Sequence, residues 1–321
     1  NFTTSTDSYN TAVGMNAGFS VTTGVENTLI GGLAGDALTD ADFNVAFGVA
    51  ALGSDTKGSK SVAIGNSALL RQNFTTATDS FNVAVGHDSG SHITTGIYNV
   101  LIGGLAGDAI TDADFNVAVG TNALSTNILG SQNVAVGNAA LNAMNPATAA
   151  DMYNTAVGAS AGLSVTTGVQ NTLVGGLAGD AITTATDSTF VGYLAGSATT
   201  DGNHNTGIGS NALAANTGGQ NTAVGRDALA ANTSASFNTA VGRSALSANT
   251  EGNRNVAVGK DAMRANTLGS RNVAVGESAL DALNLTTATD SYNIGVGYFA
   301  GGSMTTGLNN TLIGGLAGDA L

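Results

Sequence analysis

The sequence predicts an all-β chain folded as a parallel β-solenoid, in which short strands of successive repeats stack on one another. Three observations predict this fold. A glycine recurs along the whole chain, a β-branched pair flanking one small residue precedes it, and turn residues separate the copies. Because 42% of the residues are apolar and only 10% are charged, the composition favours order over disorder.

The recurring glycine, called the anchor glycine below, ends runs such as Asn-Thr-Ala-Val-Gly. Its spacing is 17 residues, apart from one step of 16 and three of 21. No linker interrupts the series, so we expect residues 1–321 to form a single repeat domain of about 18 coils, grouped in fours as super-repeats of about 72 residues. The anchors stand at positions 14, 31, 48, 65, 86, 103, 120, 137, 158, 175, 192, 209, 225, 242, 259, 276, 297 and 314.

The residues before each anchor glycine alternate as a strand does. Counting from the anchor, position −3 is always Thr, Val or Ile, and position −1 is Val or Ile except at Phe47. Side chains two apart share a face of a strand, and β-branched residues favour strands. We expect this pair to fill the coil interior, the glycine to turn the chain, and a second short strand to follow around the Ala at position +3.

Position −4 is Asn in sixteen copies, with Ser61 and Ser188 as the exceptions. In-register stacking places these amides above one another at about 4.8 Å, where each one is able to donate and accept along the axis. We therefore predict a structural ladder. Its representative members are Asn10, Asn27, Asn44, Asn82 and Asn116, with the anchors Gly14, Gly31, Gly48, Gly86 and Gly120.

Positions −2 and +4 exchange volume between coils. Leu29 and Leu101 are matched by Gly35 and Gly107, whereas several coils with Ala at −2 carry Leu at +4. Four coils are small at both positions, and each is followed by a Leu/Gly coil whose Leu could fill the gap along the axis. Close packing predicts such an exchange when two side chains enter one confined space. Since the β-branched pair is expected to fill the interior, we expect this second apolar face to meet another chain.

Several function classes are disfavoured by composition. The net charge of −13 argues against binding nucleic acid, which relies on many Lys and Arg residues. No apolar run of 18 residues is present, so no membrane insertion by a helix is expected, and the absence of Cys excludes a disulfide framework.

The chemistry-bearing residues give little support to an enzyme. His87, His92 and His204 lie in predicted turns, where solvated histidines are the simpler interpretation. No cofactor is expected. Calcium is the alternative at the two Asp-Ala-Asp runs beginning at Asp40 and Asp112, although the glycine-aspartate nonapeptide of calcium-binding β-rolls is absent.

Cations gather near the C-terminal part of the repeat series. Arg226, Arg243 and Lys260 directly follow anchor glycines, with Asp227 and Asp261 beside them. We favour simple charge pairing, and the alternative is a strip that contacts an anion or an acidic glycan.

Aromatic residues also share one place in the repeat, directly before the Asn. We expect them to cover the ends of the apolar core or an interchain seam, and stacking on sugars is the alternative. They are Tyr9, Phe43, Phe81, Tyr98, Phe115, Tyr153, Phe237 and Tyr292.

The run Asn-Thr-Ala-Val-Gly-x-x-Ala, with the variant Ser61-Val62-Ala63-Ile64-Gly65-Asn66-Ser67-Ala68, resembles the head repeat of YadA-type trimeric autotransporter adhesins and related bacteriophage tail-fibre repeats. The resemblance implies a left-handed β-roll, a side-by-side homotrimer, and an extracellular place on a cell surface or virion. The coils here, at 17 residues, are longer than the shorter adhesin repeat, so the connecting loop must differ.

Together these observations predict a structural segment of an extracellular fibre or adhesin, a rigid shaft or head for surface attachment. The alternatives are a bacteriophage tail-fibre segment and an ice- or carbohydrate-binding solenoid. Ice binding requires ranks of exposed Thr, and the expected inward orientation of position −3 counts against it. Partners would be further copies of the chain, side by side or end to end as a filament, and a host-cell surface or glycan.

Overall fold

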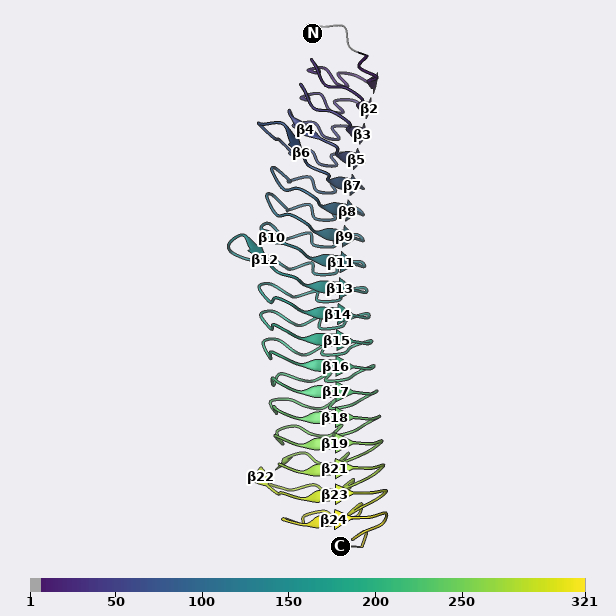
Figure 1. Ribbon diagram of the computed structural model, residues 1–321, viewed down its shortest axis with the longest axis vertical. Coiled ribbons are helices and arrows are strands. Elements are labelled where there is room, and N and C mark those ends of the chain that lie inside the picture. The colour runs from purple at the N-terminus through teal and green to yellow at the C-terminus, as the bar shows by residue number, and fades with distance from the viewer. Residues whose placement is uncertain (1–6, 321) are drawn as a thin grey trace. The chain divides into compact units, whose positions relative to one another are not determined.

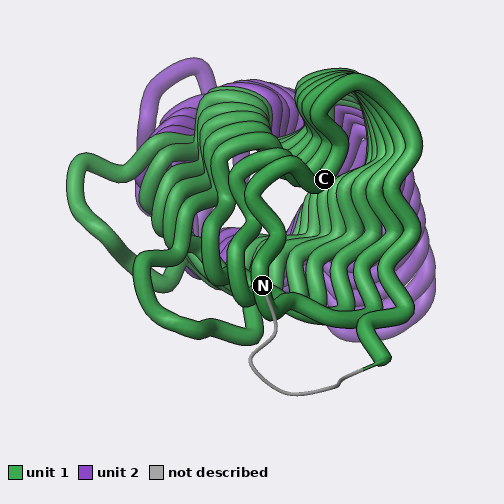
Figure 2. The backbone as a smooth tube through the Cα atoms, turned by 90° about the horizontal axis from the view of Figure 1, so that it is seen from above, with its two compact units in different colours: residues 1–160 green, residues 161–321 purple. Residues whose placement is uncertain are grey.

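The computed structural model describes residues 7–320 and shows an all-β parallel β-solenoid of about 18 turns (Figure 1). No helix occurs among these residues. The chain falls into two compact units, Asn1–Ser160 and Ala161–Leu321, which are described separately. Viewed along the stacking direction, the coils within each unit lie over one another (Figure 2).

In unit 1 the strands at positions −3 to −1 pair in parallel and in register, as Val83 with Val100 and Val100 with Val117. The period of the sequence therefore sets the register directly. The strands are β1 (Thr11–Val13), β2 (Thr28–Ile30), β3 (Val45–Phe47), β5 (Val62–Ile64), β7 (Val83–Val85), β8 (Val100–Ile102), β9 (Val117–Val119), β11 (Val134–Val136) and β13 (Thr155–Val157).

Unit 2 repeats this arrangement, with Thr189 paired to Thr206 and Thr206 to Thr222. The single 16-residue step between two anchor glycines does not disturb the register of β16 with β17. The strands are β14 (Thr172–Val174), β15 (Thr189–Val191), β16 (Thr206–Ile208), β17 (Thr222–Val224), β18 (Thr239–Val241), β19 (Val256–Val258), β21 (Val273–Val275), β23 (Ile294–Val296) and β24 (Thr311–Ile313).

The longer 21-residue steps form bulges, each held by a two-residue parallel pair of strands. The pairs are β4 (Gly58–Ser59) with β6 (Thr78–Asp79), β10 (Gly130–Ser131) with β12 (Ala150–Asp151), and β20 (Gly269–Ser270) with β22 (Thr289–Asp290). These loops project beyond the ordinary coils (Figures 1 and 2). An insertion is tolerated here because the strand that follows it returns to register.

The second strand expected around position +3 is wrong. The segment after each anchor glycine is a series of turns, because positions +2 and +4 adopt left-handed backbone conformations, as at Leu33 (φ 60°) and Gly35 (φ 54°). Backbone hydrogen bonds still join successive coils there, from Leu33 N–H to the Met15 carbonyl and from Gly35 N–H to the Ala51 carbonyl. Successive coils are therefore joined by hydrogen bonds between turns as well as between strands.

The anchor position requires glycine for two physical reasons. Gly14 has φ 134°, a conformation that residues with a Cβ resist. A Cβ on Gly14 would also lie 2.5 Å from the carbonyl oxygen of Gly31 in the next coil. The turn predicted at this glycine is present, and close axial stacking explains why no other residue replaces it.

The core of each coil is formed by positions −2, +3, +4 and +7, the last as at the fully buried Ile110. Leu101 and Ala106 are fully buried, and a Cβ added to Gly107 would lie 2.7 Å from Leu101 Cδ2. Positions −2 and +4 thus share one space, as the volume exchange predicts. Leu101 also fills the gap of the preceding coil, since a Cβ on Gly90 would lie 2.7 Å from its Cδ1. This space is inside a single chain, however, so the expectation that it meets another chain is wrong.

Candidate interaction surface

The β-branched residues at positions −3 and −1 point outward, opposite to the sequence-based expectation. In β8, Leu101 is fully buried, Val100 is half-buried, and Ile102 is 39% exposed. The reason is the Asn at position −4. It lies on the same face as position −2, and its amide must be inside to form hydrogen bonds, so positions −3 and −1 face out. We call these two outward columns the β-branched face.

The β-branched face differs between the two units. From β3 to β11 in unit 1 both columns are apolar, with Val at position −3 and Val, Ile or Phe at position −1. From β14 to β18 in unit 2 position −3 is Thr throughout, beside Val or Ile. Among the residues that the structure describes, the hydroxyls of Thr189, Thr206 and Thr222 form no hydrogen bond with protein groups.

The predicted Asn ladder lies inside the coils from Asn27 to Asn293, and Asn10 at its beginning is half-buried. The Asn44 backbone N–H donates to Asn27 Oδ1 at 3.0 Å, and Asn44 Nδ2 donates to the Gly58 carbonyl at 2.9 Å. The same pattern holds at Asn116, whose N–H donates to Asn99 Oδ1 at 3.0 Å. Each side chain thus binds the backbone of its neighbouring coil, rather than acting as a ligand site. The members Asn10, Asn27 and Asn82 occupy equivalent places.

Unit 2 contains a second buried Asn ladder, which we did not expect from the sequence. Asn232 Nδ2 donates to Asn216 Oδ1 at 2.6 Å, and Asn249 Nδ2 donates to Asn232 Oδ1 at 2.9 Å. Asn266 continues the series at 3.2 Å from Asn249 Oδ1. The dipeptide Asn-Thr recurring seven residues after the anchor was the available signal.

The aromatic residues at position −5 form an exposed column beside the β-branched face. Phe81, Tyr98 and Phe115 stack with ring centroids 5.4 and 5.0 Å apart, and Lys60 Nζ lies 5.1 Å from the Phe81 ring centroid. Tyr98 is 43% exposed in the single chain. The expectation that these rings cover the ends of the apolar core or an interchain seam stays a prediction.

The predicted cation strip is brought together on the surface of unit 2, where it is charge-paired. Arg226 Nε lies 3.1 Å from Asp227 Oδ2, and Lys260 Nζ lies 2.8 Å from Glu277 Oε1. Arg243 lies 3.7 Å from an Asp261 oxygen. A hydrogen bond to Glu277 raises the pKa of Lys260. All three cations are exposed, so each pair contributes little stability.

The two Asp-Ala-Asp runs bind backbone groups of neighbouring coils through their carboxylates. Asp42 Oδ1 accepts the Val25 N–H at 2.8 Å, and Asp114 Oδ1 accepts the Ile97 N–H at 2.7 Å. Thr hydroxyls donate to Asp40 and Asp112. Within residues 7–320 no three His, Asp or Glu side chains gather in a way that would hold a metal ion.

Two further acidic residues are held in unfavourable surroundings. Burial raises the pKa of Asp108 and of Asp180, while a backbone hydrogen bond opposes that rise in each. One carboxylate oxygen of each has no hydrogen-bond partner in the described residues. His92 Nδ1 donates to the Asp108 carbonyl at 2.8 Å, and His87 and His204 lie on a turn and a bend. These groups do not converge on a cavity.

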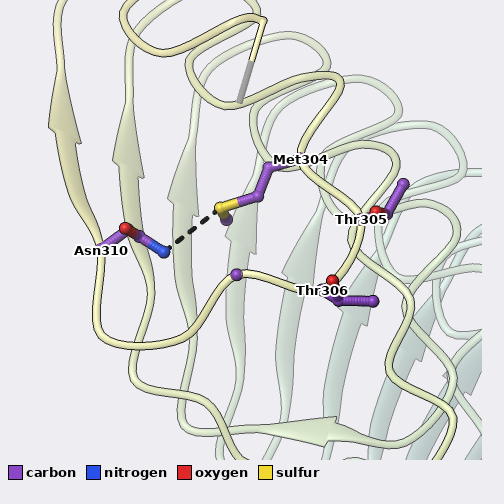
Figure 3. A pocket seen from close by; sticks show the side chains of 5 residues that line it. Met304, Thr305, Thr306 and Asn310 are labelled. Carbon is purple, nitrogen blue, oxygen red and sulfur yellow. Dashed lines mark hydrogen bonds between the residues drawn. The ribbon is translucent and has the colours of Figure 1, made fainter.

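A small hollow lies in the last coil of unit 2, lined by Met304, Thr305, Thr306, Gly307 and Asn310 (Figure 3). Asn310 Nδ2 donates to Met304 Sδ at 3.4 Å across it.

In the described part of the chain, no helix is long and apolar enough to cross a membrane. No protein-family model matches the chain, and no curated protein matches it closely enough to be a relative. The repeat architecture is therefore the firmest structural guide to function.

Proposed function

We propose that this chain is a rigid structural segment of an extracellular fibre, and that copies associate side by side through the β-branched face. One observation carries the proposal. A soluble single chain would present two unbroken columns of Val, Ile and Phe to water from β3 to β11. Extended apolar patches of this kind are typical of protein interfaces.

The interior of the coils supports a mechanical role. Each coil is joined to the next by strand pairing, by turn hydrogen bonds and by the Asn ladder. A coil is too small to bury its own apolar residues, so its stability depends on its neighbours. Such a stack resists local bending and opening, which suits a shaft or head that reaches toward a surface.

The resemblance to adhesin heads and phage tail fibres favours three copies in the assembly and a place on a cell surface or virion. An adhesin head and a tail fibre would both be stabilised by the stacking of such coils, so the repeat alone does not distinguish them. A membrane anchor would identify an adhesin, and a virion attachment domain would identify a tail fibre.

Sedimentation equilibrium at micromolar concentration tests the self-association. We expect a discrete oligomer for the natural chain, and smaller, still β-rich species for Val100→Asp, which places a charge within the face. Thr95→Asp, an exposed position away from the face, is the matched control and should assemble normally. A monodisperse monomer of the natural chain would refute the proposed association.

Ice binding is the second candidate, favoured by one observation. The objection that position −3 points inward no longer holds, because Thr189, Thr206 and Thr222 project outward from a regular sheet. The spacings of outward side chains across and along parallel strands, about 4.8 and 6.6 Å, are of the order of oxygen repeats in ice. Thermal hysteresis that disappears in Thr206→Tyr would support this candidate, and its absence in the natural chain would exclude it.

A further inference from the structure

The aromatic column at position −5 has no evident role within a single chain. Every described residue at this position has a positive φ, including Phe81 (49°), Tyr98 (58°) and Phe115 (58°). A left-handed conformation is uncommon for bulky residues and carries a cost. The rings nevertheless stay 42–52% exposed. Polar residues such as Glu26 and Gln132 share this conformation, so it belongs to the coil itself. The exposure of stacked apolar rings at this position is what indicates a partner that covers them.

The opposite edge of the β-branched face carries glycines that the chain itself does not require. Gly32, Gly104 and Gly176 follow anchor glycines at position +1, and none of them has a φ in the left-handed region. A Cβ added to Gly104 would meet no atom within 4 Å, and one added to Gly32 would meet only the Met15 carbonyl, at 4.0 Å. Neither backbone conformation nor crowding explains glycine there. We call these three residues the notch glycines.

Since the proposed function places a second copy on the β-branched face, both edges of that face lie where the copies would meet. We infer that the aromatic column of one chain docks into the edge of the next chain that carries the notch glycines, in a parallel, cyclic arrangement. The notch glycines lie four coils apart, so in register only Tyr98 of the three stacked rings would meet a notch glycine, Gly104. His87 and Thr121 lie beside that glycine in the neighbouring coils, so Gly104 leaves a gap of one side chain for the ring. Rotation about an axis parallel to the coils brings the aromatic edge of one chain against the glycine edge of the next, whereas an antiparallel pair would bring aromatic against aromatic.

This inference rests on the proposed self-association and adds its direction and its contact residues. Tyr and Phe are enriched at interface centres, where a ring that fills a pocket contributes most. Glycine permits a close approach that any side chain would block. The partner that fits is therefore another copy of this chain, rather than a sugar, because the faces of the stacked rings already cover one another.

Substitution of a notch glycine by a larger residue should weaken association without lowering the stability of the single chain. In Gly104→Leu the side chain enters open space in the single chain, so the unfolding midpoint should be unchanged or higher. Association should weaken by about tenfold or more. Thr95→Leu, exposed but away from the face, is the control. If Gly104→Leu associates as tightly as the natural chain, the notch assignment is overturned.

Cysteine cross-linking tests the direction, because the chain has no Cys of its own. Chains carrying Tyr98→Cys and chains carrying Gly104→Cys, with different tags, are co-expressed and oxidised. We expect mixed disulfides, and none from either variant alone. His87 and Thr121 lie at position +1 of the coils before and after that of Gly104. Pairing Tyr98→Cys with His87→Cys or Thr121→Cys therefore shows whether neighbouring chains are shifted by one coil along the axis. Within one chain the edges that carry positions −5 and +1 are about 20 Å apart, too far for a disulfide.

The outcomes separate the two proposals. A monomeric natural chain rejects the self-association, and with it this inference. An oligomer in which Tyr98→Cys links to itself rejects the parallel arrangement alone. An oligomer without any link from Tyr98→Cys to positions 87, 104 or 121, or one whose aromatic column binds glycan, rejects the docking of the aromatic column alone.

Discussion

The strands β7 to β9 of unit 1 and β15 to β17 of unit 2 share one backbone and one interior, yet present different faces outward. In both, the middle residue of each strand is buried between two outward residues, although its size ranges from Gly207 to Phe190. Outward, unit 1 shows Val83, Val100 and Val117, where unit 2 shows Thr189, Thr206 and Thr222. The difference teaches that the outward column can change from Val to Thr while strand pairing and burial of the middle residue stay the same, which is why we propose that the outward columns carry the interactions.

The largest expected effect comes from the shared interior. Leu101→Ala removes a fully buried side chain that fills space in two coils, and should lower the free energy of unfolding by about 2–5 kcal/mol. Val100→Ala, one residue away but outward, should cost much less in a dissociated chain. Thermal unfolding of both variants measures the contrast, and equal losses would contradict the assignment of inside and outside.

Exchange of the outward residues tests the comparison next. Replacing Val83, Val100 and Val117 by Thr keeps the shape but removes three apolar groups per chain, and should weaken association by about 2–3 kcal/mol per chain. Replacing Thr189, Thr206 and Thr222 by Val should strengthen it. Sedimentation of the two triple variants is the measurement. A loss of association in the second variant would mean that the hydroxyls themselves make the contact.

The second Asn ladder of unit 2 should be intolerant of truncation. Asn249→Ala leaves Asn232 Oδ1 without its donor in a buried place, and should cost about 1–2 kcal/mol of unfolding free energy. Ser247→Ala, in the same coil but only half-buried, is the control. Chemical denaturation measures both, and an Asn249→Ala variant as stable as the control would show that the ladder adds nothing.

The smallest effect concerns pH. The folded pKa of Asp180 is raised by burial, so its charged form destabilises the fold above that pKa, and the cost disappears as pH falls toward the unfolded value. Asp180→Asn should therefore stabilise the chain at pH 7 by less than about 1 kcal/mol after solvent screening, and less still near pH 4. A larger gain at pH 4 than at pH 7 would contradict this assignment.

The sequence predicted the solenoid, the register and the role of the anchor glycine, because one period fixes all three. It did not predict which face of the strand is inside, since β-branched residues suit either face of a stacked strand. Asn99, at position −4, and Leu101, at position −2, are two residues apart and so share one face of the strand. The inward position of the hydrogen-bonded Asn therefore indicated which face is inside. The turns after the anchor were missed because Leu33 and similar residues adopt a conformation that their type disfavours.

The central claim is that the β-branched face is covered by a second copy, and thiol labelling tests it most directly. Ile102→Cys replaces a residue that is 39% exposed in the single chain. In solution at micromolar concentration we expect it to react nearly as slowly as Ala118→Cys, which is fully buried in its own coil. An Ile102→Cys chain that reacts as fast as the exposed Thr95→Cys would contradict the account.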